Sequence, residues 1–470
     1  MKRTNVIRVV GGLLAAVFCL PLSSCKYMGA DIDAMLRPPK PTGEFFEIQQ
    51  ALEKNVDGGV LLKYPQTGAY QSAFVLHDVD GDGDDEALAF YSLETEMENQ
   101  AANLHVSLIA QIDEEWKPLT EIELPGSIDQ VDFADLDGDG RDEILVGWTQ
   151  YTTLGKKLSA YTLREGGMVQ RIVEDYTQFT ICNLIPGRNE PQLLLFNLQT
   201  TDKIASAKLL SLGVGGVQEE GTVYLDGTVT SYLTPQPGYL KDGTPAVYVD
   251  AYKGASAMIT EIVYYADSPQ EAETVSENGN QQISKLVSPP FHDSVKREND
   301  ITLRPVAAVS RDVDDDGVLD MPLMTLLPGY SNTTEGQKYY LTTWRNYDGK
   351  RFENVYSAVM DYENEYYLKY PEKWISGDTV NVTMGVQSDD KRCSFYVWNP
   401  VGQMREDELL TIQVLSEREW SGREPDDYQG YIELASRNDQ VYVAKISAES
   451  GVYALTEEGL RQAFGLIYDT

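Results

Sequence analysis

Alternation of apolar and polar residues with a period of two dominates the pattern of this chain. Positions 74–76 and 88–90 alternate on either side of a short acidic turn, and further alternating runs follow at 104–108 and 122–124. A period of two is typical of strands that bury one face. The pattern therefore predicts a repeating unit of about four strands in which an acidic loop joins the first two.

Three acidic loops of nine residues share one arrangement of side chains. Each has carboxylates at positions 1, 3, 5 and 9 and glycine at position 6, which permits a sharp turn. Several oxygens in a flexible loop suit a hard cation, and calcium is the expected ion. Position 7 can lend a backbone carbonyl whatever its side chain. The candidate metal-binding residues are Asp78, Asp80, Asp82, Asp84 and Glu86 in the first loop, Asp135, Asp137, Asp139, Arg141 and Glu143 in the second, and Asp312, Asp314, Asp316, Val318 and Asp320 in the third.

Two other interpretations of these loops stand beside the metal site. An EF-hand begins in the same way, but it needs a bidentate acid at position 12 and a helix on each side. Position 12 here is Ala89, Val146 or Leu323, and the flanks have the pattern of strands. The other interpretation is a solvated acidic turn without an ion. Three loops with the same positions filled favour metal binding, because unpaired carboxylates this close repel each other.

The spacing of the loops predicts a repeat architecture. The first two loops start 57 residues apart, and the third starts 177 residues after the second, which is three steps of 59. Two worn repeats without metal are expected between them, around residues 181–196 and 239–249. Five four-stranded units between about residues 60 and 360 predict a mostly β fold, a β-propeller with about five recognisable blades. A sandwich of the same strands is the structural alternative.

The acidic loops resemble those of FG-GAP and VCBS repeats, the calcium-loop blades of the integrin α-chain propeller and of many bacterial surface proteins. The resemblance covers about 300 residues. It implies a β-propeller over residues 59–360 whose loops bind calcium. The side chains that it assigns as ligands are Asp78, Asp80, Asp82 and Glu86, then Asp135, Asp137, Asp139 and Glu143, then Asp312, Asp314, Asp316 and Asp320.

The first 24 residues have the pattern of a lipoprotein signal peptide. A basic start precedes an apolar core at 9–20, and Leu22-Ser23-Ser24-Cys25 looks like a bacterial lipobox, in which the cysteine receives a lipid. An ordinary signal peptide with an incidental cysteine is the alternative. Residues 25–58 are expected to form a proline-rich tether and a short helix. The protein is therefore expected outside the cytoplasm, anchored to the bacterial cell membrane through Cys25.

A second domain is expected at residues 361–470, with an α+β composition and a loose resemblance to PsbP-type domains. Strands are predicted at 409–415, 431–435 and 441–446, the last two joined by a turn at 437–439. A closing helix is predicted from Thr456 to Ile467, with Thr456 as N-cap.

The charge of the chain excludes one class of partner. The net charge is −36, or −39 without residues 1–24, which carry three basic and no acidic side chains. A phosphate backbone would be repelled, so no nucleic acid is expected. Cys182 and Cys393 fall in predicted strands of different domains, and buried free thiols are expected there rather than a disulfide.

Catalytic patterns are nearly absent from the sequence. The three histidines, His77, His105 and His292, have no partner at metal-ligand spacing, and no nucleophile elbow or phosphate loop occurs. We therefore expect a non-enzymatic, lipid-anchored calcium-binding module that presents propeller loops to a protein or glycan partner. A hydrolase or lyase of cell-surface polysaccharide, with carboxylates at the propeller mouth, is the alternative. A third hypothesis gives the function to residues 361–470.

Overall fold

The fold is mostly β. The computed structural model describes residues 43–467, except for 100–102, 152–154, 166, 214, 267–272, 278–279, 293–296, 378, 425 and 448–450. The expected signal peptide and Cys25 lie outside the described residues. No helix in the described ranges combines the length and the apolar composition that crossing a membrane requires. Contacts divide the chain into a smaller unit, which includes Asp84–Leu124, and a larger unit, which includes Pro65–Gln71, Asp78–Gly83 and Pro125–Thr470.

The smaller unit contains one antiparallel sheet in the order β1-β3-β4-β5, with β2 paired to β3. Two strands flank the first acidic loop, as the alternation predicted. A 3-10 turn, η2 (Glu94–Asn99), follows the third strand. The strands are β1 (Val60–Leu62), β2 (Phe74–His77), β3 (Glu86–Leu93), β4 (Leu104–Ile112) and β5 (Glu115–Leu124).

A helix, α3 (Glu44–Asn55), packs on this sheet. Its Ile48 and Leu52 are fully buried in one core with sheet residues such as Phe74 and Ala87. These two side chains lie four residues apart and so share a helix face. The short helix predicted within residues 25–58 is confirmed.

His105 of β4 is a buried basic side chain held by two carboxylates. It is only 5% exposed. Its Nδ1 lies 2.8 Å from Glu121 Oε1, and its Nε2 lies 3.2 Å from Glu96 Oε1. The hydrogen bond to Glu121 raises the pKa of the imidazole above its ordinary value, although burial opposes this shift. His105 therefore has a structural role, as the basic partner of two carboxylates in a buried ion-pair cluster.

His105 gives the smaller unit a pH-dependent stability. Because the pKa is raised in the folded state, the contribution is complete below the unfolded pKa of about 6.5 and is lost as pH rises through the folded pKa. We expect His105→Gln to cost about 1.5 kcal/mol near pH 6 and less at alkaline pH. Denaturant unfolding followed by tryptophan fluorescence measures this cost, because Trp116 lies in the hydrophobic core of the smaller unit. A cost that does not change with pH would contradict the ion pair.

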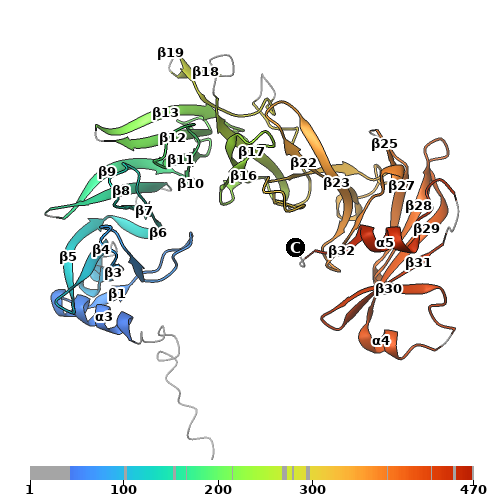
Figure 1. The fold of residues 1–470 in the computed structure, drawn as a ribbon, viewed down its shortest axis with the longest axis horizontal. Helices are drawn as coiled ribbons and strands as arrows, with labels where there is room; N and C mark the ends of the chain where they lie inside the picture. The colour runs from blue at the N-terminus through green and yellow to red at the C-terminus, as the bar shows by residue number, and fades with distance from the viewer. Residues whose placement is uncertain are drawn as a thin grey trace, which may run out of the picture. The chain divides into compact units, whose positions relative to one another are not determined.

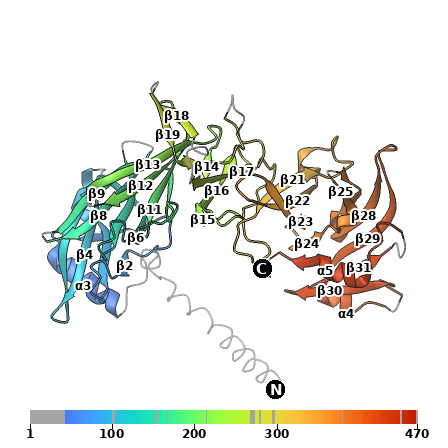
Figure 2. The same ribbon diagram turned by 45° about the horizontal axis from the view of Figure 1, so that its top comes forward.

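The larger unit continues with two four-stranded sheets, each made of strands in chain order. Figures 1 and 2 show these sheets as successive layers in the green part of the chain. The first consists of β6 (Gly126–Ala134), β7 (Glu143–Gln150), β8 (Lys156–Arg164) and β9 (Gly167–Tyr176), and the second of β10 (Gln178–Cys182), β11 (Gln192–Asn197), β12 (Ser206–Gly213) and β13 (Gly216–Tyr224).

Two five-stranded sheets follow in the same unit. One has the order β14-β16-β17-β20 with β15 paired to β16, and the other has the order β21-β22-β23-β24-β32. A hairpin of β18 (Glu273–Glu277) and β19 (Asn280–Ser284) is inserted within the first of these sheets, between β17 and β20. The remaining strands are β14 (Ser231–Tyr232), β15 (Gln236–Tyr239), β16 (Pro245–Lys253), β17 (Ala257–Tyr265), β20 (Leu286–Val287), β21 (Met321–Leu326), β22 (Tyr340–Tyr347), β23 (Phe352–Asp361), β24 (Tyr366–Lys369) and β32 (Phe464–Leu466).

Successive sheets of the larger unit pack face to face through separate hydrophobic cores. One core joins Leu145 and Leu158 of the β6–β9 sheet to Leu193 of the next sheet. Another joins Phe196 of that sheet to Val247 of the β16 sheet. Chain-order sheets stacked in this way are the packing of propeller blades. The predicted fold class is confirmed: of the six four- or five-stranded sheets in the described residues, five begin before residue 360 and correspond to the predicted repeats.

The two worn repeats keep their strands. β10 pairs with β11 across the turn at 183–191, and β15 pairs with β16 across the turn at 240–244. Both turns lie within residues 181–196 and 239–249, where the worn repeats were expected. Cys182 in the first of these hairpins and Cys393 are buried free thiols.

The residues beyond 360 form a further five-stranded sheet and a two-stranded one of β25 and β26, and they contribute to the preceding sheet. The sheet has the order β27-β28-β29-β31-β30 and contains the predicted hairpin, whose turn residues Asn438 and Asp439 have left-handed backbones. α4 begins with a capping box between Ser416 and Glu419. The elements are β25 (Ile375–Ser376), β26 (Thr379–Val380), β27 (Val382–Gln387), β28 (Arg392–Asn399), β29 (Met404–Ser416), α4 (Glu417–Ser421), β30 (Tyr431–Arg437), β31 (Gln440–Ile446) and α5 (Glu457–Ala463), with 3-10 turns η3 (Glu335–Gln337), η4 (Glu372–Trp374) and η5 (Ser388–Asp390).

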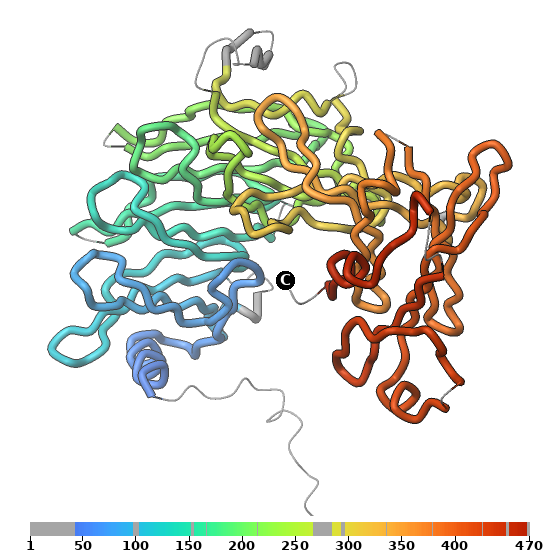
Figure 3. Tube along the Cα trace, turned by 45° about the vertical axis from the view of Figure 1, so that its right-hand side comes forward, coloured from blue at the N-terminus to red at the C-terminus, as the bar shows by residue number. Residues whose placement is uncertain are grey.

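The closing helix is shorter than predicted. Thr456 caps α5 through Gly459 N, as expected, but the helix ends at Ala463. The next residues form β32, which pairs with β24, so the prediction of helix through Ile467 was wrong. Gly465 lies so close to the Tyr367 ring that a larger residue would collide with it. Figure 3 traces this red end of the chain. The pairing also crosses the domain boundary expected at residue 360.

A buried ion pair fixes the segment 301–310 to the β16–β17 hairpin. Arg304 and Asp250 are 0% and 2% exposed, and their side chains meet at 2.7 Å. Ser310 N and Oγ also donate to Asp250, at 2.6 and 2.9 Å. The apolar residues of the segment face outward: Ile301, Leu303, Val306 and Val309 are 38–49% exposed. The polar side chains therefore hold this segment in place, and its apolar ones do not.

Candidate metal centres

The acidic loops lie at strand ends in the repeats. The first joins β2 to β3, and the second joins β6 to β7, with Ala134 and Glu143 as the last paired residues. The third precedes β21 and is closed by a single bridge between Arg311 and Asp320. Each loop is therefore a tight turn whose ends are held by backbone pairing, as the sequence predicted for the first two.

The aspartate at position 1 organises the turn in all three loops. In the second loop, Gly138 N and Asp139 N donate to Asp135 Oδ1 at 2.7 and 3.1 Å, and Gly140 N donates to Oδ2 at 2.9 Å. Asp78 in the first loop accepts from the same three positions. In the third loop Asp312 accepts from positions 3, 5 and 6. The backbone is thus curled around one carboxylate.

The turn brings further carboxylates next to that aspartate. In each of three groups, one ligand atom per residue lies within 4.8 Å of the others. Two oxygens bound at about 2.4 Å to one calcium ion can be at most about 4.8 Å apart, so the spacing fits such an ion. The groups are Asp78, Asp80 and Glu86, then Asp135, Asp137 and Glu143, then Asp312, Asp314 and Asp316.

The second loop contains a buried carboxylate oxygen without a hydrogen-bond partner. The side chain of Asp137 is 7% exposed, and its Oδ1 has no partner. Glu143 is fully buried beside it and accepts from Leu136 N at 2.9 Å and from Thr162 Oγ1 at 2.8 Å. Burial, together with the charges of Asp137 and Asp139, raises the pKa of Glu143, although the two hydrogen bonds oppose the shift. A cation placed among these oxygens would relieve both costs.

The third loop repeats this feature at Asp320. The residue is fully buried, and Oδ2 accepts from Val313 N at 3.2 Å, whereas Oδ1 has no partner. Burial and the neighbouring charges of Asp314, Asp316 and Asp312 raise the pKa of Asp320 to about 7. Two loops therefore hold a buried carboxylate oxygen that has no protein partner and that a bound cation would satisfy.

Basic side chains contact the acids at position 5 of two loops. Arg164 Nη1 lies 2.7 Å from Asp139 Oδ2, and Lys241 donates to Asp316. Arg164 and Arg171 also reach Asp137 Oδ2, at 3.5 and 3.4 Å. No local sequence pattern indicates these partners, because they become neighbours only when the chain folds. Asp139 is thereby engaged by arginine and lies outside the second group of clustered carboxylates.

At position 7 the described contacts are made by backbone N–H groups. Arg141 N donates to Asp139 Oδ1 at 3.1 Å, and Val318 N donates to Asp316 Oδ1 at 2.9 Å. Ligation by the carbonyls of Asp84, Arg141 and Val318 stays a prediction.

A worn repeat replaces the buried acid with an amide. Gln192, fully buried at the start of β11, accepts from Leu184 N at 2.9 Å. Glu143 accepts from Leu136 N in the same way. The neutral side chain keeps the hydrogen bond that closes the turn and brings no charge that needs a counterion.

Neighbouring loops of the larger unit approach each other closely. A Cβ on Gly81 would lie 2.5 Å from Gly140 O, and one on Gly138 would lie 2.9 Å from Glu190 Cγ. Both glycines have φ near +75°, which favours glycine. Position 4 of the first two loops thus requires a left-handed residue as well as the absence of a side chain, a constraint that the spacing of acids did not reveal.

Comparison with protein families identifies the acidic-loop region. Residues 78–146 match the FG-GAP-like repeat. The match covers the first two acidic loops and the strands between them, so the FG-GAP resemblance is confirmed for this part of the chain. Comparison with curated proteins gives no significant match.

Several solved structures align with the FG-GAP-containing chain at low similarity. The periplasmic gluconolactonase of Pseudomonas aeruginosa is 10% identical over 73% of this chain and 86% of its own, with a TM-score of 0.27. A rhamnogalacturonan lyase is 11% identical over 85% and 76%, with a TM-score of 0.29. An exo-β-1,3-galactanase of Phanerochaete chrysosporium is 8% identical over 84% and 92%, with a TM-score of 0.24. TM-scores of this size establish neither a common architecture nor a common activity.

Proposed function

We propose that this protein is a calcium-binding, lipid-anchored module outside the cytoplasm that presents propeller loops to a protein or glycan partner, without catalysis. The buried, unpartnered oxygens of Asp137 and Asp320 carry the calcium part of this proposal. Each lies in a loop whose clustered carboxylates suit a hard cation. Calcium is preferred over magnesium because the oxygens belong to a flexible turn, whereas magnesium demands near-ideal octahedral geometry.

The ion would act as a brace in each loop. Asp78, Asp80 and Glu86 would hold it in the first, Asp135, Asp137 and Glu143 in the second, and Asp312, Asp314, Asp316 and Asp320 in the third. Positive charge there offsets the repulsion between carboxylates and links the two ends of each turn. The loops would then be rigid enough to present a fixed surface to a partner, as binding loops on rigid scaffolds do.

The cellular place of the module is proposed from its sequence. The lipobox-like Leu22-Ser23-Ser24-Cys25 supports lipid attachment at Cys25, and the proline-rich residues 37–41 support a stiff spacer. The strongly negative charge supports a protein or a glycan as partner and disfavours nucleic acid and anionic lipid surfaces.

Calcium titration combined with thermal melting tests the brace. We expect the melting midpoint to rise as calcium is added to chelator-treated protein, by about 2–4 °C for each kcal/mol gained, and to rise less with magnesium. Sodium at matched ionic strength is the control for screening. An unchanged midpoint at millimolar calcium would refute the proposal.

Partner capture and a turnover screen separate binding from catalysis. Envelope proteins and polysaccharides retained on the protein in calcium, and released by chelator, support the module. Turnover of a polysaccharide that disappears when an acid outside the three loops is replaced would favour the hydrolase or lyase instead.

A further inference from the structure

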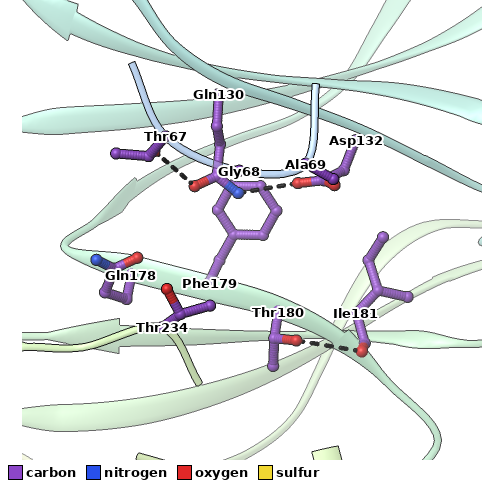
Figure 4. Close-up of a pocket in the computed structure, with 10 residues that line it drawn as sticks. All are labelled: Thr67, Gly68, Ala69, Gln130, Asp132, Gln178, Phe179, Thr180, Ile181 and Thr234. Atoms are coloured by element: carbon purple, nitrogen blue, oxygen red, sulfur yellow. Dashed lines mark hydrogen bonds between the residues drawn. The ribbon is translucent and has the colours of Figure 1, made fainter. Parts of the chain in front are cut away.

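A pocket of about 490 Å³ lies in the larger unit, away from the acid side chains of the three loops. Its residues come from the segment before the first loop, from β6 and β10, and from Thr234 before β15. β6 and β10 are the first strands of their sheets. The volume falls within the range of small-molecule sites, about 300–1,000 Å³. Figure 4 shows the lining residues.

One wall is a chain of hydrogen-bonded polar side chains. Thr67 Oγ1 donates to Gln130 Oε1 at 3.3 Å, and Gln130 Nε2 donates to Asp132 Oδ2 at 2.9 Å, as the dashed lines in Figure 4 show. Gln130 is only 7% exposed. Thr67 N also donates to the carbonyl of Asp129 at 2.9 Å, which ties the segment to β6. The wall is therefore built into the fold.

The opposite wall combines hydroxyl and amide groups with an apolar floor. Gln178 and Thr180 of β10 line it together with Thr234. Phe179 is 4% exposed, and its ring packs edge-on against Tyr176 at 5.2 Å between centroids. In Figure 4 the Phe179 ring projects from β10 toward Gly68. Its position is fixed by the core, so it offers a rigid apolar surface.

The charges of the lining residues select among ligand classes. Asp132 is the one ionisable side chain among the ten residues that line the pocket. An anionic ligand would meet this carboxyl group with no basic side chain to compensate. Five lining residues, Thr67, Gln130, Gln178, Thr180 and Thr234, carry uncharged groups that can donate or accept hydrogen bonds. Ligand hydroxyls also donate and accept, so they match this set.

We propose that this pocket binds one uncharged, hydroxylated ring, the chemistry of a neutral saccharide unit. The ring's hydroxyls would bond to Gln178 and Thr180 and to the Thr67–Gln130–Asp132 wall, and its C–H face would lie toward Phe179. The assignment deepens the glycan arm of the proposed function and rests on it. A single carboxyl group supports binding without hydrolysis, because glycoside hydrolysis ordinarily needs a pair.

Ligand-observed NMR on the calcium-loaded full chain tests the assignment. Methyl glucoside, methyl galactoside and methyl mannoside serve as neutral probes, galacturonate as the anionic probe and glucosamine as the cationic probe. We expect at least one neutral probe to bind, and Gln178→Ala and Thr180→Val each to weaken it about threefold to tenfold. Gln218→Ala makes the same truncation at an exposed residue of β13 in the same sheet and should leave binding unchanged.

Three results would overturn the saccharide assignment. They are no binding of any neutral probe, equal binding by the pocket variants and the parent protein, and preferential binding of galacturonate or glucosamine. Thermal melting of each variant in calcium shows that it is folded. An intact calcium-dependent rise in melting midpoint with no saccharide binding refutes this inference alone, whereas loss of that rise refutes the calcium module itself.

Discussion

Asp250→Asn is expected to destabilise the larger unit by about 3–5 kcal/mol. The change keeps the shape of the side chain but leaves the Arg304 guanidinium, which is 0% exposed, without its counterion. Removing one member of a buried ion pair leaves an uncompensated charge, and the cost is of this size. The remaining acceptors of Arg304 are neutral: Ala308 O at 2.6 Å, Thr260 Oγ1 at 3.0 Å and Thr302 O at 3.3 Å. Denaturant unfolding measures the loss.

Two further variants show whether the cost arises from burial. Asp348→Asn removes the same charge from an ion pair with Arg351, which is 76% exposed, and should cost far less stability than Asp250→Asn. Adding Arg304→Met to Asp250→Asn should recover part of the stability, because no buried charge is left alone. If Asp250→Asn cost no more than Asp348→Asn, the buried pair would not be what holds the 301–310 segment.

The effect of Asp320→Asn on stability is expected to change sign when calcium is added. In chelator, the variant should be as stable as the parent protein or more stable, because the change removes a buried charge whose Oδ1 has no partner. In calcium at 100 times the dissociation constant, it should forfeit up to about 2.7 kcal/mol, the stabilisation that one site provides at that concentration. The amide cannot both accept from Val313 N and present an oxygen to the ion from its other atom.

Asp315→Asn is the matched control for this loop. Asp315 lies at position 4, is exposed and has φ of 59°, a conformation that asparagine also adopts readily. The stability of the Asp315→Asn variant should differ from that of the parent protein by the same small amount in calcium and in chelator. Thermal or denaturant unfolding of both variants with and without calcium measures the crossover. An Asp320→Asn cost that is the same in calcium and in chelator would mean that no ion binds there.

Local patterns explain which parts of the fold were predictable. The loops and their flanking strands depend on residues within about a dozen positions of each other, so the acid spacing and the two-residue period were sufficient. The closing helix failed because its apolar periodicity continues through Phe464, whereas pairing of β32 with β24 is a contact with residues almost a hundred positions earlier. Pairing between such distant residues cannot be recognised from a local sequence pattern.

The metal centres divide in the same way. The spacing predicted the carboxylates that cluster, such as Asp135, Asp137 and Glu143. It did not predict the basic partners at position 5, because Arg164 reaches Asp139 only after β7 and β8 have paired. Nor could a local pattern predict that the large apolar residues of 301–309 face outward. The polar network that fixes the segment involves Asp250, 54 positions before Arg304.

The late position of β32 in the chain has a consequence for folding during biosynthesis. β32 adds to the sheet that begins at Met321, so that sheet lacks its edge strand until the chain has been made through Leu466. Until β32 has emerged from the ribosome, β24 presents an open edge to other chains. The earlier sheets contain no such late segment and can form sooner during translation. Completion of the β21–β24 sheet therefore follows synthesis of the whole β25–β31 segment.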